Sequence, residues 1–172
     1  MNTNIYGIEN RFVTKEDIED HIAVAMVVRH PKIENKIAIF FHRKYQFYTI
    51  PVGKCKDIVN LIPGMKKEAE EELGIIVTKF KIIGSFRKLY NRGHDIFTDI
   101  TSYIFEFESY ENEPKNKESE KHPSFMWMTI EEIEELSKDS RISDCTLFYL
   151  YLIKVLNREC VNDHGDELHG FL

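Results

Sequence analysis

Cysteine, glycine, proline and long apolar runs are all scarce in this sequence of 172 residues. The three cysteines, Cys55, Cys145 and Cys160, are widely spaced and form no C-x-x-C pair, which argues against a disulfide framework and a zinc site. No apolar run approaches the roughly 20 residues that cross a bilayer, and residues 1–10 lack the apolar stretch of a secretory signal. We therefore expect a protein of the reducing cytoplasm with no membrane partner.

Positive charge is also in deficit. Lys and Arg number 23 against 29 for Asp and Glu, a formal net charge of -6. Binding to a nucleic-acid backbone depends on Lys and Arg that neutralise phosphates, so we expect no stable nucleic-acid complex. A small phosphorylated ligand remains compatible with a local site or a bridging metal ion. With 42% hydrophobic residues, the chain can form one sizeable core. We expect a single domain over residues 1–160 and a polar, loose tail over residues 161–172.

The first third of the chain contains short apolar segments that are typical of buried strands. Residues 21–29, 36–42 and 46–50 are rich in β-branched and aromatic side chains. We expect these three strands to form one connected sheet. A weak helical signal over residues 14–20 precedes them.

A helix is predicted over residues 60–73, because its start and stop signals agree. Asn60 can accept a hydrogen bond from a first-turn amide, and Gly74 can adopt the left-handed conformation that ends a helix.

The remaining segments predict further strands and helices on either side of an exposed loop. Thr129 and Glu132 have the spacing of a capping box at the start of a helix. The apolar residues of the last helix could belong to the core or to a subunit contact, so a homodimer is one expectation. The predicted elements are strands over residues 75–90, 95–109 and 125–128, a loop over residues 110–122, a helix from residue 129 and a last helix over residues 143–157.

Three carboxylates of the predicted helix share one face. At about 100° per residue, Glu68, Glu71 and Glu72 fall within an arc of roughly 100°, with Glu70 on the far side. Like charges so placed repel one another, and the C-terminal half of a helix disfavours them further. A bound cation would offset this repulsion, and clustered carboxylate oxygens are suitable ligands for Mg²⁺ or Mn²⁺. The alternative is a solvated acidic face.

The sequence around these carboxylates resembles the signature of the Nudix hydrolase family, G-x5-E-x7-R-E-U-x-E-E-x-G-U, where U is a bulky apolar residue. The resemblance implies an α+β Nudix fold, a mixed β-sheet sandwiched between α-helices, over most of the chain. The positions that match without a gap are Gly53, Glu68, Glu71, Glu72, Gly74 and Ile75, with the smaller Ala69 at the first U.

Two positions depart from this signature. Val59 stands at the first Glu and Lys67 at the Arg. In the family these two side chains commonly pair and steady the loop against the helix. Because both partners have changed, we infer that loop support is altered while the metal ligands remain.

The resemblance also implies a chemistry. Nudix enzymes generally cleave a nucleoside diphosphate linked to another group, with Mg²⁺, or alternatively Mn²⁺, as cofactor. By this resemblance Glu68, Glu71 and Glu72 are the metal ligands, and Glu71 and Glu72 serve catalysis. The substrate would be a small phosphorylated nucleotide: a nucleoside triphosphate, a nucleotide sugar, a dinucleoside polyphosphate or a capped RNA, with net acidity arguing against long RNA.

Further candidates lie outside the signature helix. The segment 116–122, followed by Trp127, resembles the "EPEK…W" segment of a subset of Nudix proteins, which makes Glu118 the first and Glu120 the second candidate for general base. A charged solvent loop is the alternative.

Other residues could contact the substrate itself. Arg43, Gly53 and Lys54 could contact phosphate, although surface roles are as compatible for the two cations. The aromatic side chains that could stack on a base, or belong to the core, are Tyr45, Phe47, Tyr48, Phe86 and Tyr90.

Two other functions remain open. A Nudix-fold module could bind a nucleotide without cleaving it, as the changes at Val59 and Lys67 allow. An isomerase acting on an isoprenoid diphosphate would need an active-site cysteine upstream of the signature, and none precedes Cys55.

Overall fold

The structure is a computed structural model that describes residues 6–8, 11–13, 18–91, 97–139, 141–156 and 167–170. No helix among these residues is long and apolar enough to cross a membrane. The elements in chain order are β1 (Tyr6–Ile8), β2 (Arg11–Val13), β3 (Ile18–Val27), β4 (Lys36–His42), β5 (Phe47–Thr49), β6 (Val52–Cys55), α1 (Leu61–Leu73), β7 (Ile76–Asn91), β8 (Phe97–Glu111), β9 (Ser124–Thr129), α2 (Ile130–Asp139), α3 (Asp144–Leu152) and β10 (Glu167–Gly170).

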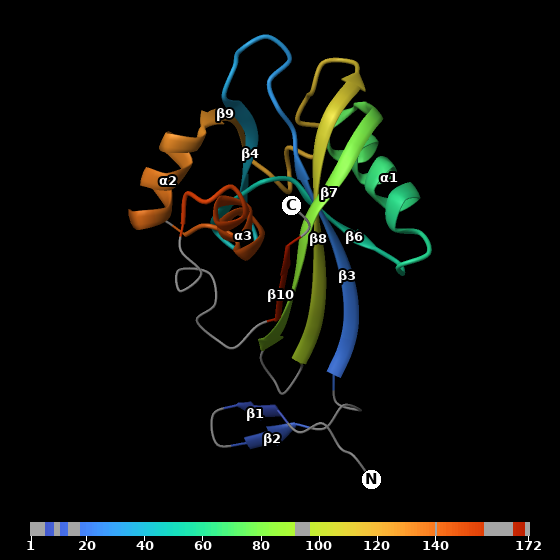
Figure 1. The fold of residues 1–172 in the computed structure, drawn as a ribbon, viewed down its shortest axis with the longest axis vertical. Coiled ribbons are helices and arrows are strands. Elements are labelled where there is room, and N and C mark those ends of the chain that lie inside the picture. The colour runs from blue at the N-terminus through green and yellow to red at the C-terminus, as the bar shows by residue number, and fades with distance from the viewer. Residues whose placement is uncertain are drawn as a thin grey trace.

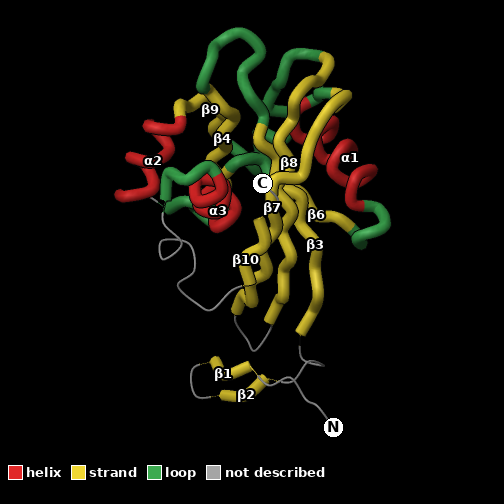
Figure 2. The backbone as a smooth tube through the Cα atoms, viewed as in Figure 1, coloured by secondary structure: helices red, strands yellow, loops and turns green. Residues whose placement is uncertain are grey.

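Two sheets form the body of the fold (Figures 1 and 2). A five-stranded sheet has the order β10-β7-β8-β3-β6 and is mixed, because β3 and β8 run parallel while their other neighbours are antiparallel. A three-stranded antiparallel sheet has the order β5-β4-β9. Strands β1 and β2 pair only with each other. The α+β class and the mixed sheet expected from the signature are thereby confirmed.

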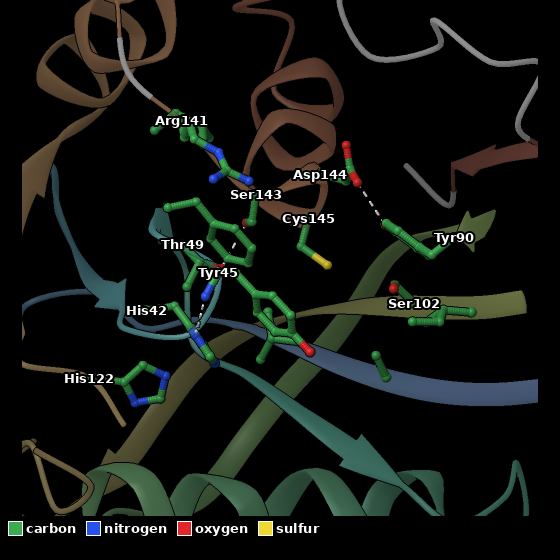
Figure 3. A pocket seen from close by; sticks show the side chains of 15 residues that line it. His42, Tyr45, Thr49, Tyr90, Ser102, His122, Arg141, Ser143, Asp144 and Cys145 are labelled. Carbon is green, nitrogen blue, oxygen red and sulfur yellow. Dashed lines mark hydrogen bonds between the residues drawn. The ribbon is translucent and has the colours of Figure 1, made fainter. Parts of the chain in front are cut away.

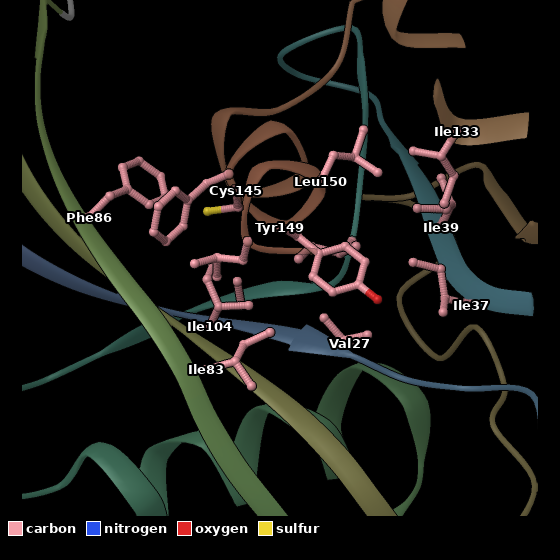
Figure 4. Packing of buried hydrophobic residues seen from close by; sticks show 14 residues of the cluster. Val27, Ile37, Ile39, Ile83, Phe86, Ile104, Ile133, Cys145, Tyr149 and Leu150 are labelled. Carbon is pink, nitrogen blue, oxygen red and sulfur yellow. The ribbon is translucent and has the colours of Figure 1, made fainter. Parts of the chain in front are cut away.

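The helices lie on opposite sides of the sheets, α1 on one side and α2 with α3 on the other (Figure 1). Strand β4 lies between two apolar clusters because its side chains alternate. Ile37 and Ile39 enter the cluster that contains α3, whereas Ala38 and Phe40 enter the cluster that contains α1. Figure 4 shows the α3 side of this packing, with Tyr149 among the aliphatic side chains.

The expectation of one connected sheet from the first three strands is wrong. The strand predicted over residues 21–29 belongs to the five-stranded sheet as β3, and the other two form β4 and β5 of the second sheet. Both edges of β3 are already paired, one with β6 and one with β8. Contact with β4 is therefore limited to the residues just after the end of β3. There, Arg29 forms an isolated antiparallel β-bridge with Ile37, and the Ala38 amide donates to the Val28 carbonyl over 2.9 Å.

Two expectations about the ends of the chain also fail. Residues 18–20 of the predicted helix continue β3, because they pair in parallel with β8 from Phe97 onward; this long-range pairing overrides the weak local signal. Residues 14–17 lie outside the described residues. In the tail predicted to be loose, β10 pairs with β7 over Glu167–Gly170, so these four residues are part of the sheet. Residues 161–166, 171 and 172 of that tail lie outside the described residues.

The last helix is shorter than predicted. Helix α3 ends at Leu152, and Lys154 follows with a left-handed φ of 63°. The Val155 amide then donates to the Leu150 carbonyl over 2.9 Å, which turns Val155 and Leu156 back onto the core. The apolar side chains of this segment pack against the core of the molecule.

The predicted helix ends are confirmed in most details. Gly74 ends α1 in the left-handed region with a φ of 67°. The capping box of α2 forms in both directions, with the Thr129 amide 2.7 Å from Glu132 and the Glu132 amide 3.1 Å from the Thr129 hydroxyl. Asn60 precedes α1, but its side chain makes no cap, because Nδ2 donates to Asp57 over 2.8 Å instead.

Candidate active site

The signature helix buries one of its glutamates almost completely. Leu61, Met65, Ala69 and Leu73 pack against the sheet, and Glu72 lies beside this apolar face with only 1% of its surface exposed. Glu68, one turn earlier, is half-buried, whereas Glu71 is exposed. The helix therefore presents Glu68 and Glu72 to the interior and Glu71 to its margin.

The Glu68 side chain lies directly against strand β6. A Cβ atom at Gly53 would overlap the Cγ, Cδ and Oε2 atoms of Glu68. Only a residue without a side chain leaves room for the carboxyl group at this position. The first glycine of the signature therefore sets where Glu68 lies, and its backbone stays within reach of a group bound there.

A lysine from the loop between β8 and β9 lies between two carboxylates. Nζ of Lys121 is 3.0 Å from Oε1 of Glu72 and 3.2 Å from Oε2 of Glu118. The second oxygen of Glu72, Oε2, is buried and has no hydrogen-bond partner. A buried carboxylate oxygen without a partner is costly, so this atom has capacity for a further cation or donor.

Burial and neighbouring charges shift the pKa values of Glu72, Glu68 and Lys121. Burial raises the pKa of Glu72 to about 7, which the neighbouring Glu118 and Glu68 favour and Lys121 opposes. Burial, followed by repulsion from Glu71, also raises the pKa of Glu68. Burial works against the charge of Lys121, but Glu72 and Glu118 outweigh it and raise the pKa of the ammonium group. The carboxylates are therefore short of positive charge even with Lys121 in place.

The loop that carries Lys121 is attached to the end of α1. The amide of Lys117 donates to the Glu72 carbonyl over 3.0 Å, and the amide of Lys115 donates to the Leu73 carbonyl over 2.9 Å. Nζ of Lys117 also donates to the Glu70 carbonyl over 3.3 Å. These bonds satisfy carbonyls that the helix end leaves unpaired, and they bring Glu118 and Lys121 to the signature helix.

Not all predicted site residues come together. Glu71 extends toward Lys67, with 3.6 Å between Oε1 and Nζ, and Glu120 is exposed. Among the described residues, no three carboxyl, imidazole or thiol groups are arranged closely enough to hold a metal ion. Glu72 and Glu118 instead contact the ammonium group of Lys121, and Glu68 lies one turn before Glu72 on the same helix.

The departures from the signature have a local explanation. Val59 is 86% exposed, and Lys67 pairs with Glu71 rather than with the loop. The loop before α1 is closed by Asp57, whose Oδ1 accepts from the Asn60 amide over 2.9 Å, and these hydrogen bonds lower the pKa of Asp57. A turn within the loop thus supplies support in place of the Glu–Arg pair that is common in the family at positions 59 and 67.

A cavity of about 480 Å³ lies next to this site (Figure 3). His42 and His122 line one end, and His122 directly follows Lys121 in the chain. The His122 ring is buried and stacks on Phe40 with 4.4 Å between ring centroids, and its Nδ1 has no hydrogen-bond partner. Burial lowers the pKa of His122 to about 4 and also lowers the pKa of His42. Both imidazoles are therefore neutral near pH 7.

The opposite end of the cavity is formed by Tyr90 and Asp144 (Figure 3). The Tyr90 hydroxyl donates to Oδ2 of Asp144 over 2.7 Å, and Nζ of Lys88 lies 3.3 Å from Oδ1. The start of α3 is held to β5 by the Ser143 hydroxyl, which donates to Thr49 over 2.7 Å. These bonds hold a charged acceptor in place at the cavity wall.

The other predicted contacts are divided between this cavity and the surface. Arg43 is exposed, and its amide donates to the Lys121 carbonyl over 3.0 Å. Lys54 is also exposed and lies opposite Ala23, a cavity residue, in the β3–β6 pair. Of the predicted aromatic residues, Tyr45, Phe47 and Tyr90 line the cavity, whereas Phe86 belongs to the core and Tyr48 packs against it.

Sequence reasoning did not single out Lys121, His42, His122 or Asp144. Lys121 and His122 directly follow the predicted bases in the "EPEK"-like segment, so their place in that segment could have marked them as site residues. His42 and Asp144 carried none, because β4 and α3 approach each other only in the fold. Cys55 and Cys145 are buried and unpaired, and Cys160 lies outside the described residues.

Comparisons with known proteins identify solved structures that share this fold. Solved structures with the same fold include a MutT NUDIX hydrolase from Burkholderia pseudomallei, at a TM-score of 0.64 and 13% identity, covering 79% of this chain and 99% of that one. A MutT protein from Methanosarcina mazei has a TM-score of 0.60 and 16% identity, with 79% and 94% covered. A mutator MutT protein from Bacillus halodurans has a TM-score of 0.58 and 19% identity, with 77% and 82% covered.

At these identities the structural likeness establishes the fold alone. A search of curated proteins finds no match. The comparison with protein families, however, matches the NUDIX domain over residues 19–147, from the start of β3 into α3. This chain therefore belongs to the Nudix family.

Proposed function

We propose that this protein is a Mg²⁺-dependent pyrophosphohydrolase, active also with Mn²⁺, that cleaves a nucleoside diphosphate linked to another group. The observation that carries the proposal is the buried carboxylate of Glu72, with an unpartnered oxygen, beside Glu68 and next to a cavity of about 480 Å³. Carboxylate oxygens are the ligands that Mg²⁺ prefers, so these residues fit the cation that members of the Nudix family typically use.

Glu68 and Glu72 would hold the cation, with Glu71 completing the set from the exposed margin of α1. When bound, the cation lowers the pKa of a coordinated water and neutralises the diphosphate charge. Glu118, on the loop that the amides of Lys115 and Lys117 attach to the end of α1, is our first candidate to accept a proton from the attacking water, and Glu120 is the second. Arg43, Lys54 and the backbone of Gly53 are proposed to contact phosphate.

The cavity is proposed to hold the nucleoside part of the substrate. Its walls combine aromatic faces with a few fixed polar groups, which is the usual composition of a small-molecule site. Tyr45 and Phe47 lie parallel to each other, with 5.5 Å between ring centroids, and offer a surface on which a base can stack. The lining includes no cluster of cations, which favours a small nucleotide over a nucleic-acid strand.

Substitution of Glu72 tests the proposal. Glu72→Gln keeps the shape of the side chain and removes its charge, so we expect Mg²⁺-stimulated turnover of a nucleotide panel to fall by more than about a hundredfold. Glu70→Gln is the matched control, because Glu70 lies on the same helix and is exposed on its other side. Equal turnover by Glu72→Gln and the parent protein, both correctly folded by circular dichroism, would refute the assignment.

A nucleotide-binding module without hydrolysis is the second candidate. It is favoured by Lys121, whose ammonium takes the position between Glu72 and Glu118, and by the altered signature residues Val59 and Lys67. Calorimetry separates the two functions. Tight nucleotide binding by the parent protein, with no product formed over hours in Mg²⁺ or Mn²⁺, would favour the binding module.

A further inference from the structure

The ammonium group of Lys121 lies where a cation would be expected. It is within 3.0 Å of Oε1 of Glu72 and 3.2 Å of Oε2 of Glu118, two residues that are far apart in the chain. Glu72 is 1% exposed, whereas the Lys121 side chain is 43% exposed. The lysine therefore reaches the buried carboxylate from the solvent side, with its stem along the loop.

The charges around Glu72 require a counter-ion. Glu68 lies one turn before Glu72 on α1, and the ammonium of Lys121 contacts both Glu72 and Glu118. One ammonium against three carboxylates leaves an excess of negative charge. Oε2 of Glu72 also remains without a partner. The single positive charge of Lys121 therefore neutralises only part of the negative charge at the site.

The attachment of Lys121 allows its side chain to move while the loop stays in place. Its carbonyl accepts from the Arg43 amide over 3.0 Å, and its amide donates to the Glu118 carbonyl over 3.0 Å. These bonds hold the backbone alone. The side chain is a flexible four-carbon stem with a compact charge, so the ammonium can leave Glu72 without disrupting the loop.

We propose that Lys121 is a built-in counter-ion that keeps Glu68, Glu72 and Glu118 together in the metal-free protein and that a divalent cation must displace it from Glu72. This inference rests on the proposed function for the cation itself. Two cations beside one carboxylate repel each other strongly where water is excluded. Lys121 and the metal ion are therefore competing partners of Glu72. In the described part of the chain, where Lys121 contacts Glu72 and Glu118, no three ligand groups converge on a metal position.

Competition makes an unusual prediction: removing the charge-pairing side chain of Lys121 should strengthen the binding of a divalent cation at the site. Lys121→Met retains a long side chain and removes the charge. We expect its Mn²⁺ affinity, measured by electron paramagnetic resonance, to rise at least about fivefold, equivalent to about 1 kcal/mol, while its metal-free melting temperature falls. Lys117→Met is the matched control, because Lys117 lies on the same loop and contacts α1 through the Glu70 carbonyl; we expect parental Mn²⁺ affinity.

A second variant tests the counter-ion role without metal. In Lys121→Met the Glu72 charge is buried and uncompensated, so adding Glu72→Gln should restore metal-free stability toward that of Glu72→Gln alone. The absence of this coupling in urea unfolding with a chelator present would contradict the counter-ion role. Saturating Mg²⁺ should likewise bring the melting temperatures of Lys121→Met and the parent closer together.

The outcomes separate this inference from the proposed function. Mn²⁺ binding that is equal or weaker in Lys121→Met than in the parent would overturn the competition while leaving the cation site intact. Mn²⁺ binding by both proteins, tighter in Lys121→Met, would support both the competition and the cation site. If neither protein bound Mn²⁺ at millimolar concentration, the cation site would be wrong, and the proposed function and the competition would fail together.

Discussion

The carboxyl group of Glu68 occupies the space that a side chain at Gly53 would need. Three Glu68 atoms, Cγ, Cδ and Oε2, lie within the volume of a Cβ at this position. This contact joins the first glycine of the signature on β6 to the first glutamate of α1. It gives the glycine a steric role, in addition to any contact of its backbone with phosphate.

Gly53→Ala is therefore expected to displace Glu68 and weaken the proposed cation site. A shift of the order of 1 Å in a positioned group can lower turnover by about a hundredfold, and we expect Mg²⁺ affinity to fall with it. Calorimetric Mg²⁺ titration and nucleotide turnover are the measurements.

The matched control for this variant is Gly64→Ala. A Cβ at Gly64 would meet Sγ of Cys55 at 2.7 Å, in the same α1–β6 interface, and among the contacts of this Cβ no carboxylate atom is present. This variant should alter stability and leave Mg²⁺ affinity near the parental value. Parental Mg²⁺ affinity in Gly53→Ala would contradict the steric role.

Asp144 tests whether the cavity holds a nucleoside. Its carboxylate accepts from Tyr90 and Lys88 and has lone pairs left for the donor groups of a base. Asp144→Asn removes the charge and can present an amide donor, so we expect KM to rise about tenfold for nucleotides whose bases present donors. Steady-state kinetics across four nucleoside triphosphates measures the change.

Asp20→Asn is the control for the cavity, since Asp20 is an exposed residue of β3 and is not a cavity residue. If Asp144→Asn left the KM of every nucleotide unchanged, the nucleoside would have to bind elsewhere. Tyr90→Phe adds a milder test, because it removes the hydroxyl that orients Asp144.

The buried imidazole of His122 predicts a dependence of stability on pH. Burial lowers its pKa in the folded protein to about 4, with Lys121 and His42 acting in the same direction and Glu118 opposing them. Between about pH 6.5 and pH 4 the unfolded chain binds a proton that the folded protein does not. The free energy of unfolding should therefore fall as the pH is lowered through this range, by at most about 3 kcal/mol from this group.

His122→Phe removes the titrating group and preserves the ring that stacks on Phe40. We expect the difference in unfolding free energy between this variant and the parent to grow in favour of the variant as the pH falls from 7 to 4.5. Urea unfolding at several pH values provides this difference. A pH-independent difference would show that the His122 imidazole is not kept neutral by the fold.

Local chemistry explains why parts of the fold were predictable. The ends of α1 and α2 depend on residues a few positions apart, such as Gly74 with its left-handed φ and Thr129 with Glu132. Spacing likewise placed Glu68 and Glu72 on one face and Glu70 on the other. The sheet of β3 was not predictable, because both of its edges pair with strands that are distant in the chain.

The sequence by itself determined the signature helix, its acidic face and membership in a family, since helical periodicity and fixed spacing are properties of neighbouring residues. Only the tertiary structure decided how that face is used. Burial distinguishes Glu72 from Glu71, although both were predicted as ligands. The loop between β8 and β9 brings Lys121 to Glu72, and α3 brings Asp144 to the cavity. Side-chain burial and contacts between distant segments arise when the sheets pack, and no local pattern in the chain encodes them.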